Sequence, residues 1–311
     1  VGSLVILLVL GLFVLQGRRA LAESYMVKGA TIGISNLSAA ESYFAKAASL
    51  DLRNDAYLRL LAETRRARLE QKLVSAPKDE QTALQEIRDL TEATLAPARR
   101  ATELAPGNAS NWITLGNIYL DIAPITSGAA VGAADAFGKA QALSPSDPAI
   151  LVNLGLAKAF SAQSAQSEES KALAQSAEEL LKQAAAIRPN YALAHLQLAR
   201  LLAQKQDVEG ALQSYRQAQA LIPSDASLRY EIGLYLLQNQ RTEAAQTDLE
   251  ESVRLSPSFS NARWFLAQVY EMQGTLDKAV EQIQKVVGLN PDNEQAKTRL
   301  EELQKKLERK K

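Results

Sequence analysis

The chain repeats one arrangement of apolar and polar residues several times. A proline closes each copy, at positions 106, 145, 189, 223, 257 and 291, and the last four prolines are spaced 34 residues apart. Apolar residues stand two positions before each proline, and small or apolar residues recur five, eight and twelve positions before the last five. Spacings of three and four residues place these side chains on one face of an amphipathic helix. A fixed period of this length predicts a solenoid of repeated helical units.

A second apolar stripe precedes the first and carries a small residue in each copy. Its members are Leu115-Gly116, Leu154-Gly155, Leu198-Ala199, Ile232-Gly233 and Leu266-Ala267. A glycine or alanine at this point lets the two helices of a hairpin approach closely. The proline ends the second helix, because it lacks an amide proton and clashes with the preceding turn. Residues suited to cap the next helix follow each proline, namely Ser146-Asp147, Asn190, Ser224-Asp225, Ser258 and Asp292-Asn293.

This arrangement resembles the tetratricopeptide repeat. One copy carries all eight signature positions of that motif: Trp112, Leu115, Gly116, Tyr119, Ala133, Phe137, Ala140 and Pro145. The resemblance covers about residues 37–311 and implies an all-α fold, a right-handed superhelical solenoid of helix hairpins. We expect degenerate repeats over 20–106, five repeats over 107–293 (roughly 109–147, 148–191, 192–225, 226–259 and 260–293) and a capping helix over 294–311.

The N-terminal copies depart from the pattern. The segment "AAESYFAKAASLDL" (39–52) keeps the apolar register but has Leu52 in place of the proline. The segment "AYLRLLAETRRARL" (56–69) begins a hairpin whose second helix is expected at about 80–105. Surface loops absorb extra residues more easily than a core does. We therefore expect the longer copies to place theirs in loops at 124–128 and 161–170.

The chain starts with an uncharged apolar run, residues 1–17, that is followed by Arg18 and Arg19. Seventeen helical residues span ~25 Å, slightly less than the ~30 Å hydrocarbon core of a bilayer. We predict a transmembrane helix over 1–19, in a bacterial inner membrane, and the two arginines favour the cytoplasmic side for the repeats. In the alternative, residues 20–22 ("ALA") form a signal-peptide cleavage site and a periplasmic chain begins at Glu23.

Charge and composition argue against several classes of function. The 35 basic residues balance the 35 acidic residues, whereas a general nucleic-acid binder needs a basic surface. The chain has no cysteine and one histidine, His195, so neither a zinc site nor a cysteine–histidine pair is expected. His195 occupies the repeat position of Trp112, which predicts a packing role. We expect no catalytic residue, metal ion or cofactor in this segment.

The resemblance also implies a concave groove lined by the first helix of each hairpin. In this sequence the lining positions are Asn117, Asn153, Gln197, Arg200, Tyr230, Glu231, Leu234, Trp264, Phe265, Gln268 and Met272. Because amide side chains pair with a peptide backbone as both donor and acceptor, we expect a protein or peptide partner. Asn117 and Asn153 match two asparagines of the carboxylate-clamp subfamily, which grips chaperone tails. Ile113 and Leu193 stand where its lysines should be, which argues against such a role.

Structural alternatives exist for the most prominent groove residues. The capping helix could cover Trp264 and Phe265 and so remove them from the groove. Tyr230 could pack against the neighbouring repeat, and Asn117 could bond to Asn153 across adjacent helices. A solenoid has a concave face whether or not a ligand binds there.

Two functions remain open at this point. The first is a membrane-anchored, non-catalytic scaffold for protein–protein interaction. The second follows from a further resemblance. An apolar run followed by repeats with "NWITLGNIY" (111–119), "SNARWFLAQVYEMQG" (260–274) and "LNPDNEQAK" (289–297) resembles the C-terminal tail of an O-antigen-ligase-like membrane protein. That resemblance implies an accessory domain of an envelope glycosyltransferase, with its catalytic part upstream and polysaccharide-assembly proteins as partners.

Overall fold

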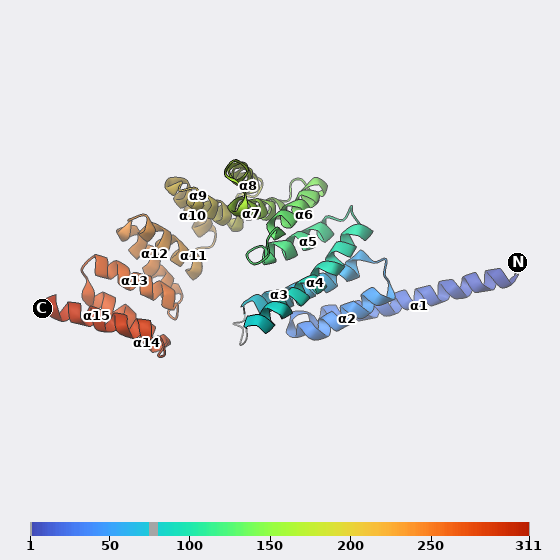
Figure 1. Cartoon of the computed structure of the whole chain (residues 1–311), viewed down its shortest axis with the longest axis horizontal. Helices are drawn as coiled ribbons and strands as arrows, with labels where there is room; N and C mark the ends of the chain where they lie inside the picture. The colour runs from blue at the N-terminus through green and yellow to red at the C-terminus, as the bar shows by residue number, and fades with distance from the viewer. Residues whose placement is uncertain (1, 75–79, 311) are drawn as a thin grey trace. The chain divides into compact units, whose positions relative to one another are not determined.

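The computed structural model of the chain describes residues 2–74 and 80–310, and the regular structure in them is entirely helical (Figure 1). The chain forms two compact units, residues 1–187 and 188–311. The N-terminal unit contains α1 (Gly2–Ile32), the short 3-10 helix η1 (Gly33–Asn36), α2 (Leu37–Leu50), α3 (Asp55–Val74), α4 (Glu80–Leu104), α5 (Ala109–Ile122), α6 (Ala129–Leu143), α7 (Pro148–Ser164) and α8 (Ser167–Ile187). The C-terminal unit contains α9 (Ala192–Gln204), α10 (Val208–Leu221), α11 (Ala226–Gln238), α12 (Thr242–Leu255), α13 (Ser260–Met272), α14 (Leu276–Leu289) and α15 (Glu294–Lys310).

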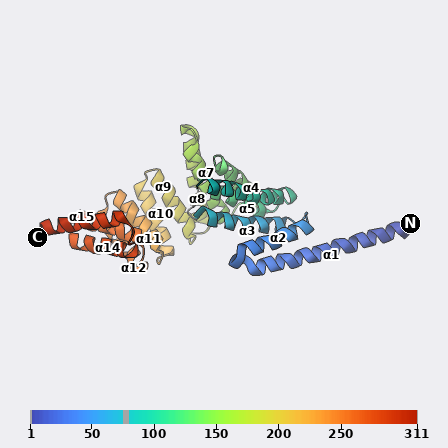
Figure 2. The ribbon, with the colours of Figure 1, turned by 60° about the horizontal axis from the view of Figure 1, so that its bottom comes forward.

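Consecutive helices pack in pairs, and within each unit every pair packs on the next. The pairs are α1–α2, α3–α4, α5–α6 and α7–α8 in the N-terminal unit, and α9–α10, α11–α12 and α13–α14 in the C-terminal unit. The last helix, α15, packs on α14. Figure 2 shows the same hairpins from a second direction. The predicted all-α architecture of repeated helix hairpins is therefore confirmed.

Helices that precede a proline end two residues before it. For example, α6 ends at Leu143, and Ser144 leaves the helical region with a ψ of 74° ahead of Pro145. In the next unit α10 ends in the same way, with a ψ of 64° at Ile222. The cause is local, because the proline ring disfavours the α conformation of the residue before it. The periodic prolines thus set where the second helix of each hairpin ends.

The predicted caps and loops are confirmed in part. Asp147 and Asp225 cap α7 and α11, each accepting a hydrogen bond from the amide two residues later, at 2.9 and 2.8 Å. The predictions at Asn190 and Ser258 are wrong, because the N-cap residues of α9 and α13 stand one position later in each case. The loop expected over 161–170 is also mostly wrong: α7 and α8 extend into it and leave residues 165–166 between them.

In several hairpins a glycine lies where the two helices approach each other closely. Gly116 on α5 faces the buried Phe137 on α6, and a Cβ atom at this glycine would lie 2.8 Å from the ring. Gly29 on α1 faces Phe44 on α2 with the same spacing. The second half of α1 is therefore the first helix of a hairpin, although the resemblance in the sequence begins only near residue 37.

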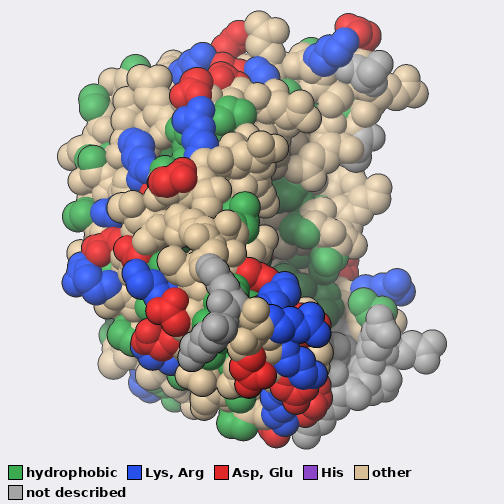
Figure 3. All heavy atoms as spheres, turned by 90° about the vertical axis from the view of Figure 1, so that its left-hand side faces the viewer, with side chains coloured by type: hydrophobic (Ala, Val, Ile, Leu, Met, Phe, Trp, Pro, Cys, Tyr) green, Lys and Arg blue, Asp and Glu red, His purple; other side chains and the backbone are tan. Residues whose placement is uncertain are grey.

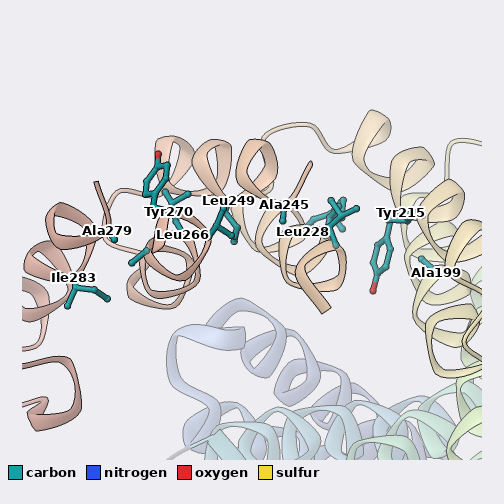
Figure 4. Packing of buried hydrophobic residues seen from close by; sticks show 14 of the residues in the cluster. Ala199, Tyr215, Leu228, Ala245, Leu249, Leu266, Tyr270, Ala279 and Ile283 are labelled. Atoms are coloured by element: carbon teal, nitrogen blue, oxygen red, sulfur yellow. The ribbon is translucent and has the colours of Figure 1, made fainter. Parts of the chain in front are cut away.

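The C-terminal unit has a continuous core that runs through all of its hairpins. Figure 4 shows this core, with Ala199, Tyr215, Leu228, Ala245, Leu249, Leu266, Tyr270, Ala279 and Ile283 on successive helices. All of them except Leu228 and Tyr270 are apolar positions that the repeat pattern predicts. Leu303 of α15 is fully buried in the same core. The last helix is therefore fixed to the unit by apolar contacts as well as by polar ones.

The apolar start of the chain forms the first half of α1. Leu12, Phe13 and Val14 have exposed fractions of 60%, 76% and 62%. Within the described residues, no helix combines the length and the apolar character needed to cross a membrane. The transmembrane helix predicted over 1–19 is therefore not supported. The predicted boundary at residue 19 is also absent, because α1 continues to Ile32 and packs on α2. Val1 lies outside the described residues, and so do the side chains of residues 2–11.

Candidate protein-binding surface

Nine of the eleven predicted groove residues lie on the first helices of the three hairpins in the C-terminal unit. They are Gln197 and Arg200 on α9, Tyr230, Glu231 and Leu234 on α11, and Trp264, Phe265, Gln268 and Met272 on α13. None of these nine side chains is fully buried, and Met272 has an exposed fraction of 58%. The repeat period explains their common placement, since equivalent positions recur every 34 residues.

An ion pair joins the first two of these helices. The guanidinium of Arg200 donates two hydrogen bonds to the carboxylate of Glu231, from Nε at 2.7 Å and from Nη2 at 2.6 Å. The hydroxyl of Tyr215 donates to the same carboxylate at 2.8 Å. Burial raises the pKa of the Tyr215 phenol, and the charge of Glu231 raises it further. The hydrogen bond to Glu231 likewise raises the pKa of Arg200. The surface between α9 and α11 is thus polar and held in one geometry.

Aromatic rings connect the second and third of these helices. The ring of Tyr230 lies 4.9 Å from that of Phe259 and 6.0 Å from that of Phe265, measured between centroids. Tyr230 and Phe265 also pack against the hydrophobic core. The structural alternative therefore holds for Tyr230, which packs against the neighbouring repeat while part of its ring stays exposed.

A cleft of about 510 Å³ lies at the end of this surface, between α13 and α15. It is lined by Trp264, Gln268, Gln295, Thr298, Arg299 and Glu302. On one side of it Glu271 accepts hydrogen bonds from Arg299 and, at 2.6 Å, from Lys306. The last helix therefore stands beside Trp264 without closing over it. The α15 residues of the cleft give no signal in the sequence, where 294–311 has only the pattern of a polar capping helix.

The two remaining groove residues lie in the N-terminal unit. The side-chain amide of Asn153 on α7 donates to Asn117 Oδ1 on α5 at 3.2 Å. This is the contact across adjacent helices that the structural alternative describes. The predicted groove residues therefore form two sets, an asparagine pair in one unit and nine residues in the other.

A family model described as tetratricopeptide repeat matches residues 163–226 and 230–294. Over these two ranges the chain is similar to tetratricopeptide repeats. A tetratricopeptide repeat protein from Parabacteroides merdae has a solved structure with a TM-score of 0.59 and 15% identity, covering 91% of this chain and 98% of that one. At this identity the likeness shows the fold alone, an all-α helical repeat solenoid.

Two further solved structures are similar over part of the chain. YrrB, described as a tetratricopeptide repeat protein with an unusual peptide-binding site, aligns with a TM-score of 0.47 and 17% identity over 65% of this chain and 96% of its own. MamA aligns with a TM-score of 0.45 and 22% identity over 53% of this chain and 90% of its own. No curated protein matches the chain. None of these comparisons bears on the resemblance to an O-antigen-ligase-like protein, which stays a prediction.

Three of the repeated hairpins share a hydrogen bond for which the repeat pattern gives no signal. Trp112 Nε1 donates to the carbonyl of the proline six residues earlier at 2.8 Å, and Arg263 Nε does the same at 2.8 Å. His195 Nε2 lies 2.9 Å from the equivalent carbonyl of Pro189. His195 is buried and occupies the position of Trp112. Its predicted packing role therefore includes a bond to the turn that starts its repeat.

A buried charge links two of the repeats. Asp248 on α12 is only 1% exposed and accepts hydrogen bonds from Arg229 and Gln219, both at 2.9 Å. Arg216 Nη2 also forms an ion pair with the carboxylate of Asp248, at 2.8 Å. Two cations and an amide offset the cost of burying this carboxylate. The repeat period gives no signal for this group, because its members come from α10, α11 and α12.

Charges of both signs are mixed on the surface. On the face that Figure 3 shows, acidic and basic side chains stand next to one another, and neither forms a large continuous area. Exposed pairs such as Lys285 and Glu281, one helical turn apart at 2.6 Å, are typical of this pattern. In the part of the chain that the structure describes, no three acidic or histidine side chains are grouped so as to hold a metal ion.

Proposed function

We propose that this chain is a non-catalytic scaffold that binds an extended segment of a partner protein along α9, α11 and α13. The observation that carries the proposal is the succession of groove residues on these three helices, which ends in the cleft beside Trp264. Exposed amides such as Gln268 can pair with a peptide backbone. The partly buried rings of Tyr230 and Trp264 offer their remaining apolar surface to its side chains.

The chemistry of the surface supports binding over catalysis. Its polar groups are amides, carboxylates and guanidinium groups, and the strongest of them, Arg200 and Glu231, neutralise each other. Such a pair orients the two side chains and engages the carboxylate of Glu231, which would otherwise be available as a base. Tetratricopeptide repeats are, in general, non-catalytic scaffolds, and the chain fits that description.

Peptides selected on the full chain from a random library test the proposal. Gln268→Ala and Met272→Ala remove exposed side chains of α13 that lie outside the core, so the fold should persist. We expect each variant to weaken the selected peptides about 3- to 10-fold in fluorescence anisotropy. Gln213→Ala, an exposed change on the second helix α10, is the control and should leave the affinity unchanged. Equal affinities for all four proteins would contradict the proposal.

The location at a bacterial inner membrane, with the repeats in the cytoplasm, is a separate proposal. It is supported by the uncharged run of residues 1–17, by Arg18 and Arg19 behind it, and by the exposure of apolar side chains such as Phe13. A C-terminal tag should fractionate with membranes and resist protease in spheroplasts. A tag digested in spheroplasts would place the repeats in the periplasm, and a tag in the soluble fraction would contradict attachment.

A further inference from the structure

The cleft between α13 and α15 has walls of fixed spacing. Trp264 and Gln268 come from α13, and the other lining residues come from α15. Glu271 of α13 accepts hydrogen bonds from Arg299 and Lys306 of α15, which ties the two helices together beside the cleft. Leu303 of α15 is buried in the core that Trp264 packs against. The cleft is therefore formed before any ligand enters it.

The two tryptophans of the chain have different surroundings. The indole N–H of Trp112 donates to Pro106, and Lys139 Nζ lies 4.6 Å from the centroid of its rings. For Trp264, the described residues supply neither a cation over the ring nor an acceptor for the indole N–H. An indole is the best aromatic partner for a cation. The interaction that the chain makes internally at Trp112 is thus open to a ligand at Trp264.

The charges of the cleft favour a cation. Glu302 has a side chain that is 55% exposed, and its contact with Arg299 Nη1 is long, at 3.4 Å. Arg299 itself is less exposed, at 28%, and its other terminal nitrogen donates to Glu271. An entering anion would meet Glu302 and a guanidinium already engaged by two carboxylates. An entering cation would meet a carboxylate that is open to solvent, an indole ring and the same guanidinium, whose charge Glu271 and Glu302 offset.

We propose that this cleft binds a lysine or arginine side chain of the partner segment. The cation stacks on Trp264 and pairs with Glu302, while the amides of Gln268 and Gln295 bond to the backbone on either side. The inference rests on the proposed function and specifies its partner: a peptide with a basic residue where it reaches α15.

The full chain labelled with ¹⁵N at its two tryptophan indoles tests this proposal. Each indole gives one NMR signal, so Trp112 is an internal reference. We expect the peptide acetyl-Ala-Ala-Lys-Ala-Ala-amide to shift the Trp264 signal saturably and to leave the Trp112 signal in place. The peptide with norleucine in place of lysine keeps the alkyl chain without the charge, and we expect it to bind about tenfold more weakly.

A pair of variants separates the carboxylate of the cleft from its neighbour. Glu302→Gln removes the charge that faces the ligand and should weaken the lysine peptide about threefold. Glu301→Gln removes an exposed carboxylate of the same helix that does not line the cleft, and it should leave the affinity unchanged. An equal effect of the two changes would overturn the role of Glu302.

Other outcomes overturn the inference as a whole. A Trp264 signal that does not move, or equal binding of the norleucine peptide or of a glutamate peptide, would exclude recognition of a cation. Suppose that the selected library peptides lack basic residues and that Gln268→Ala and Met272→Ala weaken their binding. That outcome would overturn this inference and leave the proposed function standing. Unchanged affinities in those two variants would overturn the proposed function itself.

Discussion

Arg200 and Glu231, on two successive first helices, form a bidentate ion pair with hydrogen bonds of 2.7 and 2.6 Å. Two parallel bonds fix the relative orientation of the groups better than one bond can. Because Tyr215 of the intervening helix α10 donates to the same carboxylate, the pair connects three helices of the C-terminal unit. The polar surface between α9 and α11 is therefore part of what stabilises the fold.

Removing one charge of this pair should destabilise the chain. Glu231→Gln keeps an acceptor for Tyr215 but loses the charge-assisted bonds from Arg200. Hydrogen bonds to charged groups contribute about 1.5–3 kcal/mol, and solvent screening at the exposed Arg200 reduces this. We therefore expect the free energy of unfolding to fall by about 1–2 kcal/mol. Urea unfolding followed by circular dichroism measures the change. The exposed Glu301→Gln is the control and should change it by less than about 0.5 kcal/mol; equal stabilities of both variants would contradict the prediction.

The phenol of Tyr215 should make stability fall at alkaline pH. Burial, with the nearby charge of Glu231, raises its pKa above the ordinary value of 10.0, so the folded chain keeps the phenol proton where the unfolded chain loses it. Above about pH 10 the unfolded state then binds fewer protons, and the free energy of unfolding decreases as pH rises. We expect a steeper decrease between about pH 9 and pH 11 for the wild type than for Tyr215→Phe in urea titrations. Parallel decreases would contradict the prediction.

Two glycines of one hairpin should respond oppositely to alanine. At Gly116 a Cβ would lie 2.8 Å from the ring of Phe137, so Gly116→Ala should lower the free energy of unfolding by about 1–3 kcal/mol. At Gly138, one residue after Phe137, a Cβ would meet open space. Gly138→Ala should instead raise the free energy of unfolding by about 0.5–1 kcal/mol, because alanine is a better helix former than glycine. Denaturant midpoints of the two variants give the comparison, and a gain at Gly116 would show that the hairpin can relax.

The turn inside each of the last three hairpins contains a residue with positive φ. Gln206, Gln240 and Gly274 hold equivalent positions 34 residues apart, with φ values of 62°, 60° and 74°. A side chain in this region costs energy that glycine avoids. Gln206→Gly and Gln240→Gly should each raise the free energy of unfolding by about 1 kcal/mol, and Gly274→Ala should lower it by a similar amount. Thermal unfolding checks the signs, and a lower midpoint for both glycine variants would refute this account.

Much of the fold could be read from the sequence, because it depends on neighbours within one hairpin. The proline period set the helix ends, and the small residue at Gly116 indicated a close approach of the two helices of its hairpin. The prediction failed where no periodic signal existed. Residues 161–170 look like a loop in composition, but they continue α7 and α8 except at 165–166. The first half of a hairpin inside α1 was hidden by the apolar run that precedes it.

The candidate site also has a part that the sequence predicts and a part that it does not. Its positions on α9, α11 and α13 follow from the repeat alone, and so does the packing position of His195. The pairing of Arg200 with Glu231 does not, since the two residues are 31 positions apart and several acidic side chains could have met the guanidinium. The sequence likewise does not predict that α15 lines the cleft beside Trp264, because the segment 294–311 has a mostly polar pattern.

By itself, the sequence determined that this protein is an all-α array of helix hairpins and which helices carry its candidate binding surface. Local forces suffice for that: proline ends helices, small residues admit neighbours, and apolar positions recur with the helical period. Only the tertiary structure decided which polar groups meet. Asp248 is buried between Arg216 and Arg229, and Glu302 stands open beside Trp264. Such contacts join different helices, so they depend on the packing of the whole unit.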